Sequence, residues 1–139
     1  MIAVACEPAM SDVIKPAGWP RPSGFSHGVL ARGQVLAIAG QIGAGPDGRL
    51  VGNDLVAQFD KALGNVAEVV GAAGGRIADL VSMTIYVVDL AAYVAAREEL
   101  GGVWRRRAGR HYPAMTLVET RGLAETGALV EISALAVLP

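Results

Sequence analysis

The sequence has little of the chemistry that most catalytic and metal-binding sites use. It holds one cysteine and two histidines in 139 residues, and no His, Cys and carboxylate spacing is typical of a metal site. Cys6 has no second cysteine for an internal disulfide, so nothing here requires an oxidising compartment. We therefore expect no metal, and we expect a cytoplasmic protein.

An excess of charge of one sign is also missing. The 12 Lys and Arg residues stand against 13 Asp and Glu residues, for a net charge of −1, whereas nucleic-acid-binding proteins usually carry a clear basic surplus. The basic cluster Arg105–Arg107 with Arg110 is typical of a solvated helix end. No apolar run approaches the roughly 18 residues of a membrane span, and no signal peptide is recognisable. We expect neither a nucleic acid nor a membrane as partner.

What the chain does have is apolar periodicity. Apolar residues make up 53% of it, which favours one globular domain over residues 1–139, with residues 1–23 as an extended or loop lead-in. Helices are predicted from Asn53–Asp54 to Gly74–Gly75 and from Asp89 past Trp104. Strands are predicted at 28–32, 35–40, 80–88, 115–120 and 128–138, the first two joined in a hairpin at Gly33–Gln34. The order β-β-α-β-α-β-β is typical of an α+β fold.

The predicted strands indicate how the chain assembles. Strand 80–88 is apolar at nearly every position, and neither face of strand 128–138 is generally polar. Two helices cover only one face of such a sheet, so we expect another subunit on the second face. A long loop folded across that face is the alternative.

Glu131 is the carboxylate that stands out. It lies alone in the apolar string from Ala128 to Val137, so it must be hydrated, paired or protonated. One interpretation is a structural ion pair with an arginine. The other is a pocket carboxylate that acts on a bound water or ligand. The residues leave both interpretations open.

Several short strings resemble the YjgF/RidA family, in the family's order and spacing from about residue 24 to residue 137. Each string is weakly diagnostic, but together they are specific. They are Gly24–Val29, Ala39–Gly43, Gln58 with Ala62–Val66, Ala72–Gly74, Val81 with Thr84–Val87 and Asp89, Pro113–Ala114, and Ala128–Val137.

The resemblance implies a chorismate-mutase-like fold, in which a mixed β-sheet carries two helices packed on one face. It also implies a homotrimer with small-molecule pockets in the clefts between subunits. The best-known activity of the family is the hydrolysis of enamine and imine intermediates derived from amino acids, without a cofactor. In that reaction an arginine after Pro-Ala holds the substrate carboxylate, and a glutamate on the last strand positions or activates water. Glu131 matches this glutamate.

The chain departs from the family pattern at five positions. Four of the changes make the expected pocket less polar: Met115 replaces the arginine, Phe25 a tyrosine, Ala39 a serine and Leu117 a cysteine. The fifth, Arg97, stands where asparagine is common. We expect Phe25, Ala39, Gly40, Met115, Leu117 and Glu131 to gather in one cleft at a subunit boundary, with Arg97 or Tyr93 nearby.

Three functions are consistent with these residues. The first is a divergent hydrolase or deaminase whose substrate lacks the usual carboxylate, or whose substrate carboxylate is held by Arg97 or another arginine. The second is a ligand-binding or regulatory trimer that performs no chemistry. The third is RNA cleavage, which the balanced charge disfavours.

Overall fold

The computed structural model describes residues 11–139, so Cys6 lies outside the described residues. A four-stranded sheet has the order β3-β6-β4-β5, formed by β3 (Gln34–Ile42), β4 (Leu80–Val87), β5 (Ala114–Glu119) and β6 (Val130–Leu138). The pairs β3–β6 and β6–β4 are antiparallel, and β4–β5 is parallel. The predicted mixed sheet of an α+β fold is therefore confirmed, with strand ends within about two residues of the expected ones.

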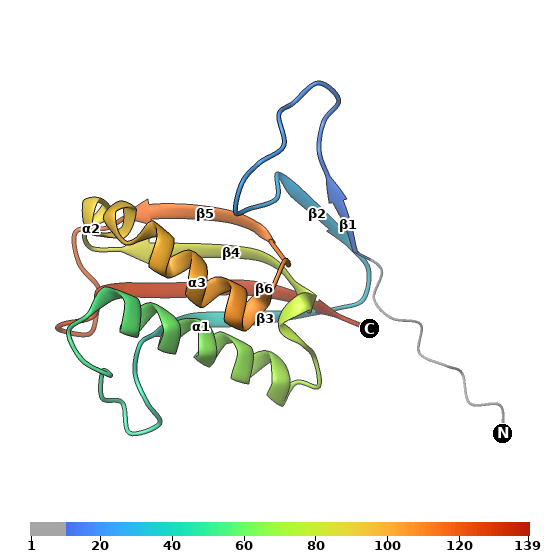
Figure 1. Ribbon diagram of the computed structural model, residues 1–139. Coiled ribbons are helices and arrows are strands. Elements are labelled where there is room, and N and C mark those ends of the chain that lie inside the picture. Colours follow the sequence, from blue (N-terminus) through green and yellow to red (C-terminus); the bar gives the residue numbers. More distant parts are fainter. Residues whose placement is uncertain (1–10) are drawn as a thin grey trace, which may run out of the picture.

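Three helices lie on one side of this sheet (Figure 1): α1 (Leu55–Ala72), α2 (Leu90–Ala95) and α3 (Arg97–Ala108). A short 3₁₀ helix, η1 (Ile77–Asp79), leads into β4. The first helix starts as predicted, because the Asp54 carboxylate accepts a hydrogen bond from the backbone N–H of Ala57 at 2.9 Å. It ends before Gly74, whose φ of +85° suits a glycine.

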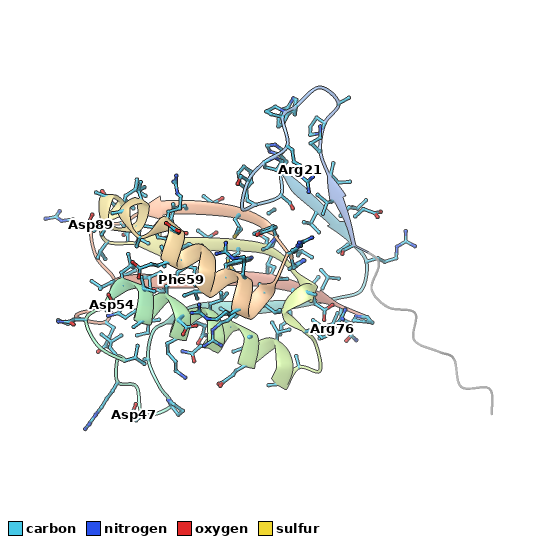
Figure 2. All side chains as sticks on the ribbon, in the orientation of Figure 1. Arg21, Asp47, Asp54, Phe59, Arg76 and Asp89 are labelled. Atoms are coloured by element: carbon cyan, nitrogen blue, oxygen red, sulfur yellow. The ribbon has the colours of Figure 1, made fainter. Side chains whose placement is uncertain are left out.

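The second predicted helix is divided in two. Asp89 caps α2 as expected, accepting from the N–H of Ala92 at 3.0 Å (its position is labelled in Figure 2). The helix is then interrupted at Ala96, where ψ is 8°, and continues as α3. Gly101 and Gly102 both lie inside α3. Together α2 and α3 form the connection that parallel neighbours such as β4 and β5 require.

The predicted hairpin at Gly33–Gln34 is wrong. Strand β2 (Gly28–Ala31) pairs antiparallel with β1 (Ser11–Ile14), which lies within the predicted lead-in. The two strands form an arm that stands away from the main sheet (Figure 1). A Cβ on Gly33 would lie 2.0 Å from the carbonyl oxygen of Leu138, so the corner is packed against the end of β6. The chain therefore changes direction at this corner between β2 and β3, and β2 pairs with β1.

The two faces of the sheet differ in burial. On β6, residues with even numbers from Val130 to Leu138 are buried under the helices, and the odd ones between them are partly exposed. On the opposite face, Val35 is 71% exposed and Leu135 is 41% exposed. Among residues 11–139 no loop covers this face, so the loop alternative does not hold for the described chain.

Gln58 fixes the start of α1 to the start of β6. Its side chain is fully buried. The amide nitrogen donates to the carbonyls of Gly52 at 2.7 Å and Gly127 at 3.0 Å, and the amide oxygen accepts from the N–H of Leu129 at 2.8 Å. Three part-buried backbone groups from two loops are thus satisfied by one buried side chain.

We predict that Gln58→Leu lowers the free energy of unfolding by about 2–4 kcal/mol, because it leaves part-buried backbone groups without partners. Urea unfolding followed by circular dichroism measures this loss. Glu68→Ala, an exposed change on the same helix, is the control and should stay within about 0.5 kcal/mol of the original. A Gln58→Leu protein as stable as the control would contradict the role of these hydrogen bonds.

Candidate functional site

A cavity of about 640 Å³ lies on the helical side of the sheet. Helices α2 and α3 form one wall, strands β4 and β5 form the opposite wall, and the segment from Ser23 to Phe25 closes one end. Phe59, labelled in Figure 2, contributes from α1. The cavity therefore sits inside the β4–α2–α3–β5 connection and falls within the usual size range of small-molecule sites.

The walls of this cavity are mainly aromatic and aliphatic. The rings of Trp104 and Tyr112 are stacked, with centroids 6.0 Å apart and planes 9° from parallel. The indole N–H of Trp104 donates to the carbonyl of His111 at 3.1 Å, so this polar group is satisfied by the protein itself. The remaining apolar lining residues are Phe25, Phe59, Ile85, Leu100, Met115 and Leu117.

Ser26 holds the segment from Ser23 to Phe25 in place. Its hydroxyl donates to the carbonyl of Tyr112 at 2.5 Å, and its backbone N–H donates to the carbonyl of Pro113 at 3.0 Å. Ser26 is buried, which suits a structural anchor better than a nucleophile. Phe25 therefore reaches the cavity because the residue after it is bonded to the residues that precede β5.

Three polar side chains with hydroxyl or guanidinium groups line the same cavity from α2 and α3: Tyr93, Arg97 and Arg105. Burial raises the pKa of the Tyr93 phenol above its ordinary value, and the neighbouring Arg97 guanidinium opposes this shift in part. The phenol is thus protonated at neutral pH and is available as a hydrogen-bond donor. The cavity combines apolar walls with cationic groups, an arrangement that suits an organic anion.

The structure places four of the predicted site residues at this cavity, namely Phe25, Arg97, Met115 and Leu117. Met115 lies beside Met83 in the β4–β5 register and packs against the buried core. It therefore faces the helices, as does Leu117 two residues later. That these side chains bind a ligand stays a prediction.

Ala39, Gly40 and Glu131 do not line this cavity. The expected cleft lies at a subunit boundary, so a common cleft that includes these three residues stays a prediction. Glu131 opposes Tyr86 and Ile42 in the sheet, on the face away from the helices. A Cβ on Gly40 would lie 2.0 Å from the Glu131 Oε1 atom, so the carboxylate rests directly over the Gly40 backbone. The reason is the two-residue period of a strand: Ile132 faces the core, and Glu131 faces away from it.

One of the two interpretations of Glu131 is a structural ion pair with an arginine. Within residues 11–139, the ion pairs are Arg49–Asp47 and Arg107–Asp60. Glu131 is half-buried and has no arginine within ion-pair distance in the described chain. The structural ion pair is thus not formed by the chain alone, and the carboxylate at Gly40 is available for other contacts.

Sequence reasoning missed part of this cavity. It treated Arg105 as a member of a solvated helix end, and it did not single out Tyr112. The spacing of Arg97, Gly101 and Arg105, four residues apart, was the available signal, because it places them on one face of a helix. In the part of the chain that the structure describes, no group of three His, Cys, Asp or Glu side chains has metal-binding geometry. None of the helices there combines the length and apolar character needed to cross a membrane.

Sequence comparison relates this chain to known proteins. The chain matches the family model described as Endoribonuclease L-PSP over residues 20–138. A RutC family protein of Pyrococcus horikoshii is 31% identical over 128 residues, which covers 91% of this chain and 98% of the relative. A 2-iminobutanoate/2-iminopropanoate deaminase of Capra hircus is 30% identical over 127 residues, covering 90% and 88%.

The solved structures agree with the sequence matches. A crystal structure of a Rid family protein from Yersinia pestis superposes with a TM-score of 0.81 at 36% identity, over 92% of this chain and 98% of that one. The match spans the helices and strands that build the cavity as well as the sheet face that carries Glu131. The chain therefore belongs to the YjgF/RidA family.

Proposed function

We propose that this protein is a cofactor-free homotrimer that binds a small organic acid with an apolar body in the cavity between α3 and β5. The observation that carries the proposal is the combination of stacked aromatic walls with the Arg97 guanidinium at one cavity. An apolar body is favoured there by burial against the rings, and the carboxylate is favoured by charge-assisted hydrogen bonds.

Arg97 takes the role that the family resemblance gives to an arginine at position 115. Met115 offers only a thioether and cannot hold a carboxylate. Arg97 lines the same cavity from the opposite wall, next to the Tyr93 phenol. When the carboxylate of the ligand is held at α3 instead of β5, the apolar body of the ligand points toward Met115 and Leu117. The ligand therefore differs from the usual 2-imino acid in orientation and in shape.

The Glu131 carboxylate favours a second candidate function, the hydrolysis of an enamine or imine with an altered substrate. It is half-buried over Gly40 and is not paired with an arginine of the described chain. Such a carboxylate can position water. Since it faces away from the helical cavity, this activity requires a second copy of the chain to bring Glu131 to a bound ligand.

The open sheet face supports the trimer. It carries the exposed side chains of Val35 and Leu135 and a shallow hollow of about 280 Å³ lined in part by Ser82, Thr84 and Ser133. An exposed apolar face of this kind marks an interaction surface. The number of subunits follows from the resemblance to a trimeric family.

Ligand binding is tested with benzoate as the probe. We predict that the protein binds benzoate and that Arg97→Gln weakens binding about tenfold, because the charge-assisted hydrogen bonds are lost. Saturation-transfer NMR and calorimetric titration measure it. Arg106→Gln removes a neighbouring charge outside the cavity and serves as the control. Equal binding by the Arg97→Gln protein would refute the assignment of Arg97.

Assembly is tested by sedimentation equilibrium. We predict three times the chain mass of 14.3 kDa, and a shift toward smaller species in Leu135→Glu, because a charge on the sheet face is costly to bury. Val94→Glu is the control, since Val94 is comparably exposed, at 46%, but lies on α2. A monomer independent of concentration would overturn the trimer.

Deamination is tested with 2-iminopropanoate. We predict little activity in the unmodified protein and a gain in Met115→Arg, because the substrate carboxylate then finds a bidentate partner. Val51→Arg adds the same charge at an exposed loop position and should change nothing. A rate for the unmodified protein equal to that of a deaminase with the arginine would contradict the prediction.

A further inference from the structure

Three residues of α3 line the cavity at intervals of one helical turn: Arg97, Gly101 and Arg105. Residues four apart lie on the same face of a helix, and the outer two are separated by roughly 12 Å along the axis at 1.5 Å per residue. Between them, Gly101 has no side chain. Besides Leu100 and Trp104, this side of the cavity therefore carries two arginines with Gly101 between them.

The Arg105 guanidinium lies beside Gly101 on the surface of α3. A Cβ on Gly101 would lie 3.4 Å from the Arg105 Nη1 atom, and one on Gly102 would lie 3.9 Å from Nη2. The guanidinium thus folds back along the helix toward its N-terminal end, the usual direction for helical side chains. Its charge is consequently displaced about one turn toward Arg97.

Neither of these two charges is neutralised within the described chain. Arg107, the neighbour of Arg105 on α3, is bonded to Asp60 at 2.6 Å and acts as a structural ion pair. No carboxylate of residues 11–139 lies within ion-pair distance of Arg97 or Arg105, and no Asp, Glu or Lys side chain lines the cavity. The position four residues before Arg105, where a helix often places a compensating glutamate, is Gly101.

We infer that the ligand of this cavity carries two negative charges on a planar or branched apolar body. This inference rests on the proposed function and narrows its substrate class. Two guanidiniums at one cavity repel each other, and a ligand with one negative charge compensates only one of them. A dianion compensates both, with its body against Trp104, Tyr112 and Leu117.

The test compares three probes that share a benzene ring. Benzoate carries one charge, benzene-1,3-dicarboxylate carries two on separate groups, and phenyl phosphate carries two on one group. By calorimetric titration at neutral pH, we expect at least one dianion to bind ten times more tightly than benzoate. A dicarboxylate preference assigns the two charges to separate groups, and a phosphate preference assigns both to one group.

Two variants connect the preference to the cavity. Arg105→Gln should reduce the preference for the dianion over benzoate to less than threefold. Arg106→Gln, one residue along the same helix and outside the cavity, should leave the preference unchanged. Thermal unfolding of both variants confirms that they are folded.

The outcomes separate this inference from the function on which it rests. If benzoate and both dianions bind equally, or if Arg105→Gln keeps the full preference, the dianion inference is overturned and the organic-acid site stands. If none of the three probes binds, both are overturned.

Discussion

The arrangement depends on one constraint, the two-residue alternation of β6 in the middle of the sheet. This strand is paired on both sides, with β3 and β4, so a slip of one residue would turn its whole apolar set from one face to the other. The hydrogen bonds of Gln58 to Gly127 and Leu129 hold the chain immediately before the strand begins. In this register Ile132 lies in the core and Glu131 lies on the open face.

The register divides the chemistry of the molecule between two surfaces. The helical side has a cavity with cations and aromatic rings but no carboxylate among its described lining residues. The open side has the Glu131 carboxylate at Gly40 and exposed apolar side chains. A single chain can therefore hold a ligand on one side of the sheet and present an acid on the other.

Much of the fold could be predicted from the sequence because local signals and burial agree. Neighbouring residues correctly predicted the Asp54 and Asp89 caps, the apolar stripe of α1 and the alternation of β6. The hairpin at Gly33 could not, because the choice of partner for β2 depends on how that corner packs against Leu138. The division of the second helix at Ala96 has no explanation in the residues around it.

The candidate site was predictable only in part, for a similar reason. Phe25, Met115 and Leu117 were identified from their places in a family pattern, and they do share a cavity. The alternation that predicted the strand also predicted the face on which Glu131 lies. It did not predict how far Glu131 lies from Met115. Arg105 was overlooked because the position of its guanidinium beside Gly101 is visible only in the structure.

The bond between Ser26 and Tyr112 has a consequence for how the molecule forms. It joins residues 86 positions apart, and closing so long a loop carries an entropic cost that local contacts do not. Helix α1 and the strands β3, β4 and β6 can associate without it, whereas the end wall of the cavity cannot exist until the chain has reached Tyr112. We therefore expect the end wall of the cavity to be among the last parts of the structure to form during folding. This wall is also the part that opens first when this long-range contact is lost.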